Sequence, residues 1–154
     1  MQNPVRTKVF MCYSHRDARH LARLHVHLAY YKRRGLLDVW DDMKVLPGGL
    51  WREEINQALL CSRVAILLVS ADFLASRFIA EYELPPLLAA ARTDGTIILP
   101  VILSPCRFTD SELSQFQAVN SPSKPLISMS LNDKESIWDR VAENVKDAIN
   151  PGEY

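Results

Sequence analysis

The stretch VAILLVSADFLASRFIAEYELPPLL, residues 64–88, decides how the rest of the chain is arranged. Its first six residues, 64–69, are apolar without a break, as in a strand that helices cover on both faces. After Ser70 the spacing of the apolar residues changes to the period of a helix. We therefore expect a central strand that leads through a turn into a helical segment.

Two carboxylates lie in this helical segment, and the helical period gives them different directions. A helix turns by about 100° per residue, so Glu83 shares a face with the apolar Ile79 and Leu87. Glu81 lies one turn after Arg77, on a different side of the helix. We therefore expect Glu83 to face the protein body, where an unpaired charge is costly. Both a buried structural role and a functional role are open on this pattern.

Two prolines, Pro85 and Pro86, follow Glu83 after a single residue. Proline has no N–H group and disfavours helical geometry in the residue before it, which here is Leu84. The backbone beside Glu83 is therefore expected to be kinked or broken, which favours a functional role. The alternative is that one short helix ends at Leu84 and that Pro85 opens the next.

Composition excludes several classes of protein. The 154 residues contain 18 Lys plus Arg and 18 Asp plus Glu, and this zero balance argues against direct binding of nucleic acid. The longest apolar run is far shorter than the roughly 20 residues of a membrane span, and residues 1–7 lack the core of a signal peptide. We expect a single cytoplasmic domain without a membrane anchor. The cysteines are Cys12, Cys61 and Cys106, whose odd number and wide spacing predict buried reduced thiols rather than a disulfide framework or a zinc knuckle.

The remaining elements predict an α/β fold. Further strands are expected at residues 8–13, 36–40, 96–103 and 125–129, with helices between them. This alternation predicts a flavodoxin-like, five-stranded parallel sheet with helices on both faces. Pro100 is expected at a bulge or where strand pairing stops. The ligand crevice of such sheets lies beyond the carboxyl ends of the strands, so the ends of the first three strands, the loop at 41–49 and the Glu83 segment should meet there.

Two smaller patterns concern the first helix. Ser14 and Asp17 have the spacing of a capping box, in which two side chains satisfy N–H groups at a helix start. The histidines are His15, His20, His25 and His27. None of them forms an HxxxH pair, so no metal site is predicted.

Three segments together resemble a bacterial Toll/interleukin-1 receptor (TIR) domain. They are FMCYSHRD at 10–17, VWDDMKVLPGGLWREEI at 39–55 and ILLVSADFLASRFIAEYEL at 66–84. The resemblance implies that residues 1–154 form a single TIR domain with a core at about 8–149. Because the chain enters the domain directly after Met1 and stops just after the last expected helix, we also expect it to be the N-terminal part of a longer sensor–effector protein with a fused nucleotide-sensing domain.

Many bacterial TIR domains cleave NAD+ at the bond between nicotinamide and ribose, and the position of their catalytic glutamate matches Glu83. The family pattern places a tryptophan four residues before that glutamate, whereas this chain has Ile79 there, with aromatics at the positions of Phe78 and Tyr82. An alternative register would select Glu81, which the direction of the two side chains opposes. By resemblance, the residues expected to contact the substrate are Tyr13, Ser14, Asp41, Lys44 and Tyr82.

The resemblance thus implies an NAD+ glycohydrolase that yields nicotinamide and linear or cyclic ADP-ribose. NAD+ would be the substrate, with no cofactor. One carboxylate suffices for this chemistry, because nicotinamide is already a cationic leaving group and needs no acid to protonate it. The domain would act as an antiviral defence or cell-suicide effector when it oligomerises with other TIR domains. The alternative is a non-catalytic TIR adaptor that binds other TIR domains, with Glu83 in a structural role.

Overall fold

The computed structural model describes residues 7–40 and 50–150 of the chain. Four parallel strands form one sheet in the order β2-β1-β3-β4. Their bounds are Lys8–Tyr13 for β1, Asp38–Trp40 for β2, Ser62–Val69 for β3 and Ile97–Ile102 for β4. The predicted α/β class with a parallel sheet is confirmed, and β3 is a central strand as expected. The described sheet has four strands, so the prediction of five is wrong.

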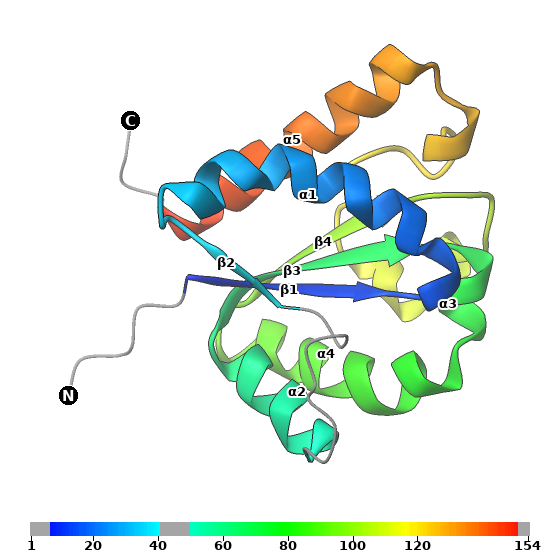
Figure 1. Cartoon of the computed structure of the whole chain (residues 1–154). Coiled ribbons are helices and arrows are strands. Elements are labelled where there is room, and N and C mark those ends of the chain that lie inside the picture. The colour runs from blue at the N-terminus through cyan, green and yellow to red at the C-terminus, as the bar shows by residue number, and fades with distance from the viewer. Residues whose placement is uncertain (1–6, 41–49, 151–154) are drawn as a thin grey trace.

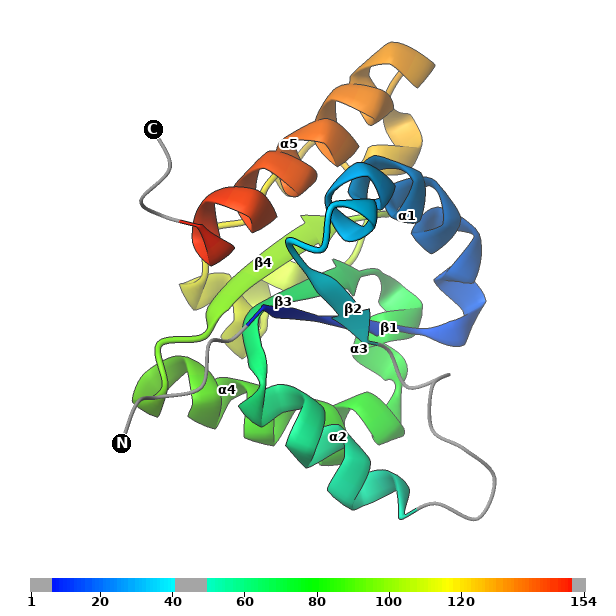
Figure 2. The same cartoon turned by 60° about the vertical axis from the view of Figure 1, so that its left-hand side comes forward.

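Helices cover both faces of the sheet, as Figures 1 and 2 show. Helices α1 (Ala18–Arg33) and α5 (Leu131–Ile149) lie on one face, and α2 (Trp51–Leu60) and α4 (Leu84–Thr93) lie on the other. Successive strand residues alternate between these two cores. In β1, Met11 packs with the α1/α5 core and Cys12 with the α2/α4 core. This double cover explains the unbroken apolar run of residues 64–69, each at most 1% exposed.

The fifth predicted strand is replaced by a side chain. Residues Leu126–Ser128, where that strand was expected, form a single 3-10 turn, η6. The carboxamide of Asn120 pairs with both backbone groups of Ile102, because its Oδ1 accepts from the N–H and its Nδ2 donates to the carbonyl, each at 2.9 Å. These are the two bonds that a neighbouring strand would make. Asn120 therefore closes this part of the β4 edge without a fifth strand.

Pro100 lies at neither a bulge nor a break, so that prediction is wrong. Its pairing register with β3 runs without a shift from Ile97 to Ile102. Its carbonyl points away from β3 and accepts a hydrogen bond of 2.8 Å from the N–H of Val119. Because the backbone groups of Pro100 face outward from an edge strand, its missing N–H removes no bond of the sheet.

The capping box at the start of α1 forms only in part. The hydroxyl of Ser14 accepts a hydrogen bond from the N–H of Arg16 at 3.3 Å, within a 3-10 turn, η1 (His15–Asp17). Asp17 is buried and its carboxylate accepts from the hydroxyl of Ser70. This second partner lies 53 residues away in the chain, so the local pattern could not indicate it.

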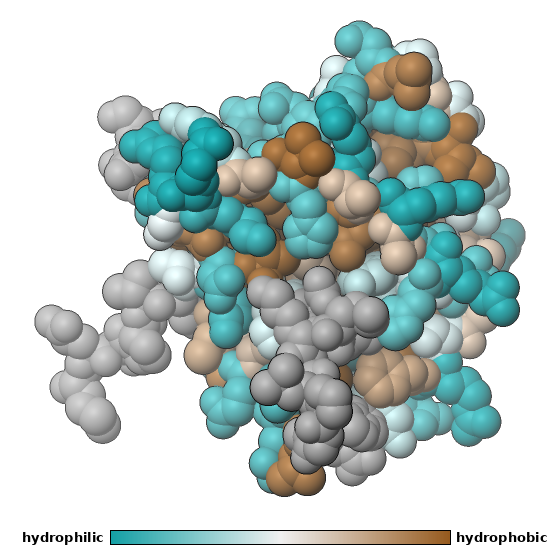
Figure 3. Space-filling view, viewed as in Figure 1, coloured by the Kyte–Doolittle hydropathy of each residue, from teal (hydrophilic) through white to brown (hydrophobic). Residues whose placement is uncertain are grey.

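Apolar side chains on the face drawn in Figure 3 form small separate areas among polar ones. Val26 and Tyr30, both of α1, are 57% and 51% exposed. The guanidinium carbons of Arg33 and Arg34 lie 5.7 and 5.6 Å from the centroid of the Tyr30 ring.

None of the helices in residues 7–40 and 50–150 combines the length and the apolar composition that a bilayer crossing requires.

Candidate functional site

Glu83 points into the protein, as the helical period predicts. It is the last residue of a π-helix, η3 (Ile79–Glu83), and it is 1% exposed. Glu81 is exposed and pairs with Arg77, also exposed, at 3.4 Å. The two carboxylates of this segment therefore have opposite environments. Only Glu83 is held within the fold.

The π-helix leads directly into α4, whose first turn contains the two prolines. Leu84 donates its N–H to the carbonyl of Ile79, five residues earlier, and α4 then begins with Pro85 and Pro86 in its first turn. N–H groups in that turn have no partner within an α-helix, so prolines are tolerated there. The predicted irregularity beside Glu83 is confirmed. Leu84 itself keeps helical angles, with φ −65° and ψ −45°, so the expectation that it would leave helical geometry is wrong.

The thiol of Cys12 holds the Glu83 carboxylate. Sγ of Cys12 donates a hydrogen bond of 3.0 Å to Oε2 of Glu83, and both residues are buried. Cys12 is the penultimate residue of β1. The contact therefore places the carboxylate under the carboxyl end of β1, on the α2/α4 side of the sheet.

A pocket of about 280 Å³ opens at the end of β1. Its walls come from two segments: the junction between β1 and α1, and the chain that leads from α3 (Ala71–Ala75) into the π-helix. The lining residues are Tyr13, Ser14, His15, Arg16, Ser76, Phe78 and Ile79. Tyr13 is 5% exposed, and the centroid of its ring lies 5.9 Å from that of the His15 ring. This end of the sheet is where ligands of doubly wound folds bind.

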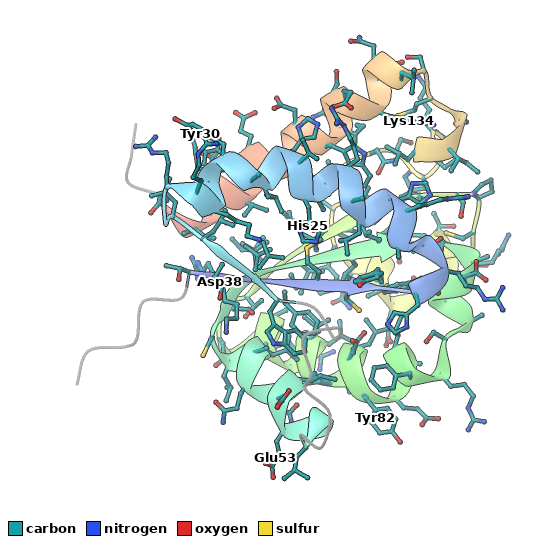
Figure 4. All side chains as sticks on the ribbon, viewed as in Figure 1. His25, Tyr30, Asp38, Glu53, Tyr82 and Lys134 are labelled. Carbon is teal, nitrogen blue, oxygen red and sulfur yellow. The ribbon has the colours of Figure 1, made fainter. Side chains whose placement is uncertain are left out.

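The predicted substrate residues fall into three groups. Tyr13 and Ser14 line the pocket, and Tyr82 contacts Phe78, with 5.5 Å between the ring centroids. Tyr82 comes from the π-helix and lies on the α2/α4 side of the sheet, as Figure 4 shows. Asp41 and Lys44 lie outside the described residues. Glu83 belongs to the same π-helix as Ile79, which lines the pocket, but Glu83 itself does not line it.

The expected meeting of three strand ends is only partly present among the described residues. Trp40, the last residue of β2, lines a different pocket of about 420 Å³ beside α2. Sequence reasoning missed His15, Arg16 and Phe78 as lining residues. Their positions next to other candidate residues could have indicated them. His15 and Arg16 follow Tyr13 and Ser14 at a strand end, and Phe78 precedes the inward-facing Ile79.

A buried polar bond joins the segments that form the two walls of this pocket. The hydroxyl of Ser70, at the end of β3, donates to Oδ2 of Asp17 at 2.5 Å. The same hydroxyl oxygen accepts from the N–H of Phe73 at 3.0 Å and so caps α3. Ser70 thereby connects the start of α1 to the start of α3.

Two observations bear on metals and thiols. Within residues 7–40 and 50–150, there is no group of three or more His, Cys, Asp or Glu side chains that could hold a metal ion.

Cys12 is buried and Cys106 is partly buried, whereas Cys61 is exposed, so the prediction of buried thiols is wrong for Cys61.

Comparison with known proteins identifies the family. A sequence profile of the TIR domain matches residues 9–146. This chain belongs to the TIR domain family. The fold agrees, because the TIR domain of the Toll-related receptor TRR-2 from Hydra magnipapillata superposes with a TM-score of 0.57 at 18% identity. That likeness covers 90% of this chain and 97% of the Hydra chain.

A bacterial relative is also similar to this TIR domain. The uncharacterized protein y4lF of Sinorhizobium fredii is 28% identical over 140 residues, which cover 91% of this chain. The matched region is 43% of the length of that relative, so this chain spans less than half of it. The match to the TIR family over residues 9–146 confirms the resemblance to a TIR domain that the sequence motifs indicate.

Proposed function

We propose that this TIR domain hydrolyses NAD+ at the bond between nicotinamide and ribose, with Glu83 as the catalytic carboxylate. The position of Glu83 supports the proposal. Its carboxylate is buried in an irregular turn, bonded to Cys12 at the carboxyl end of β1, and next to a pocket that Ile79 of the same turn lines. A buried carboxylate with a specific polar partner beside a cleft is a candidate for a functional group.

The chemistry requires a negative charge near the anomeric carbon. When the bond from ribose C1′ to the nicotinamide nitrogen breaks, its electron pair leaves with nicotinamide and C1′ gains positive charge. A carboxylate stabilises this oxocarbenium-like state. Water then attacks C1′ and releases a proton, so the products are nicotinamide, ADP-ribose and H+. Attack by a nitrogen of the adenine ring in place of water would give a cyclic ADP-ribose.

The pocket suits one part of the substrate. At about 280 Å³ it is at the lower limit of ligand sites and smaller than a dinucleotide requires. Tyr13 and Ser14 would contact the nicotinamide riboside half, with Tyr82 as an aromatic neighbour. We propose that Asp41 and Lys44 complete the site, together with a second copy of the domain. This requirement would couple turnover to oligomerisation, as a cytoplasmic defence or cell-suicide effector requires.

One observation favours a second candidate function. Glu83 is 1% exposed and does not line the pocket in this conformation, which would also fit a purely structural carboxylate. The domain would then be an adaptor that binds other TIR domains and has no activity on NAD+. In a longer protein, either function would be controlled by a fused domain, for which a nucleotide sensor remains our proposal.

Incubation of the purified protein with NAD+ separates the two functions. Nicotinamide is measured by chromatography over a range of protein concentrations, with Glu83→Gln in parallel. If the domain is an enzyme, we expect the rate of nicotinamide release to rise more than linearly with protein concentration. In Glu83→Gln this rate should fall by about 100-fold or more, as when one electrostatic partner of a transition state is removed. Self-association without any release of nicotinamide would favour the adaptor.

A further inference from the structure

We propose that Cys12 is a positioning residue, whose thiol orients the Glu83 carboxylate for catalysis. The inference rests on the proposed function and adds a second residue to it. Cys12 does not line the pocket, so it would act through Glu83 rather than on the substrate.

The contact joins a rigid element to an irregular one. Cys12 lies in β1, where its register partner in the neighbouring strand β3 is Leu67, and it is 0% exposed. Glu83 ends a π-helix, whose wide turn is less regular than the α-helix that follows it. The 3.0 Å bond from Sγ to Oε2 therefore ties the carboxylate to a strand that is paired on both sides within the sheet. Small displacements of a catalytic group are costly, because the reaction depends on near-attack geometry.

The chemistry of the donor suits this task. A thiol is a weak hydrogen-bond donor, whereas a hydroxyl is a stronger one. A strong donor would neutralise part of the negative charge that the developing cation needs. A thiol fixes the direction of one carboxylate oxygen and leaves more of its charge for the substrate. Cys12→Ser keeps a donor that can orient Glu83, whereas Cys12→Ala removes this donor.

The contact itself can be tested without any turnover. The S–H stretching vibration absorbs in an infrared window that other protein groups leave clear, and its frequency falls when the thiol donates a hydrogen bond. Replacing both other cysteines, as Cys61→Ser and Cys106→Ser, isolates the band of Cys12. We expect this band to move to higher frequency in Glu83→Gln, because a neutral amide is a weaker acceptor than a carboxylate. An unchanged band would overturn the proposal whether or not the domain is an enzyme.

Kinetics test the positioning. For Cys12→Ala we expect kcat to fall by about tenfold with KM unchanged, because the substrate does not touch the thiol. Cys12→Ser should recover kcat to within about threefold of the wild type. Cys106→Ser, the same substitution at a partly buried cysteine, serves as the matched control. Thermal unfolding of each variant checks that the protein is folded at the assay temperature.

The kinetic outcomes separate this inference from the proposed function. Full kcat in Cys12→Ala, beside lost turnover in Glu83→Gln, would overturn the positioning role and leave Glu83 catalytic. A higher kcat in Cys12→Ala would also overturn it, because the thiol would then restrain Glu83 rather than orient it. Full turnover in Glu83→Gln would remove the catalytic assignment and with it the positioning role, while the S–H band would still report the contact.

Discussion

Ser70 and Asp17 share a buried hydrogen bond of 2.5 Å where β3 and β1 end side by side. Through it, the segment after β1 is linked to the segment after β3. The pocket lies between residues 13–16, which precede Asp17, and the chain that follows α3. The bond spans 53 residues of sequence. It is therefore a tertiary contact that serves both the fold and the shape of the candidate site.

Ser70→Ala should destabilise the domain by about 1–3 kcal/mol, because a buried carboxylate loses a donor and α3 loses its cap. Asp17→Asn keeps an acceptor for the hydroxyl and should cost less than Asp17→Ala. Urea denaturation of the single variants and of Asp17→Ala/Ser70→Ala gives the coupling energy. Additive effects in the double variant would show that the two side chains do not interact in solution.

The carboxamide of Asn120 is expected to be essential for the β4 edge. In Asn120→Ala the N–H and carbonyl of Ile102 lose both partners, with an expected cost of about 2–4 kcal/mol. Asn132→Ala, an exposed asparagine near the start of α5, is the control. Amide hydrogen exchange should accelerate at Ile102 in the first variant alone. Unchanged protection of that amide would mean that another group satisfies it.

Stability should depend on pH through Glu135, at the contact between α1 and α5. The hydrogen bond with Arg23, and to a smaller extent the one with His27, holds the pKa of Glu135 below its ordinary value. The pKa of Glu135 is lower in the folded protein than in the unfolded chain. Its contribution to folding stability is therefore complete above the ordinary glutamate pKa of about 4.3, and it is lost as pH falls through the pKa of the folded state. Glu135→Gln should therefore be less stable than the wild type near neutral pH, with a difference that shrinks in acid.

Glu143→Gln, an exposed glutamate of the same helix, is the control for that experiment. Denaturation midpoints measured from about pH 7 down to about pH 3 supply the comparison. High salt should reduce the effect of Glu135→Gln, because the groups are at the surface. A difference from the wild type that grows in acid would have the wrong sign for this account.

The three thiols should react with an alkylating reagent in a fixed order. Cys61 is exposed and should be labelled first. Burial raises the pKa of the Cys106 thiol, so little thiolate is present and its labelling should be slower. Cys12 is 0% exposed and should react only when the domain opens. Peptide mass spectrometry at intervals gives the three rates, and rapid labelling of Cys12 in the native domain would contradict its burial.

The sequence predicts those parts of the fold that rest on local patterns. The apolar run at 64–69 indicates a central, doubly covered strand, and the helical period separates Glu83 from Glu81 correctly. The prolines indicate an irregular turn, but no local pattern distinguishes a π turn from a break.

The parts that sequence reasoning missed depend on partners far along the chain. The segment at 125–129 has the composition of a strand, but Asn120 already makes the edge bonds that a strand would make. The bond from Cys12 to Glu83 spans 71 residues, and alternation in β1 predicts only the face of the sheet on which the thiol lies. Pairings of this kind require the tertiary structure.

Glu81 and Glu83, two neighbouring carboxylates of one turn, give a paired comparison that decides whether Glu83 is catalytic. Nicotinamide release from NAD+ is measured per mole of folded protein for Glu83→Gln, for Glu81→Gln and for the wild type. Each substitution removes one negative charge from the same short segment, but only Glu83 is buried beside the end of β1. We expect activity close to the wild type for Glu81→Gln and a loss of about 100-fold or more for Glu83→Gln. Equal activity in the two variants would contradict this expectation.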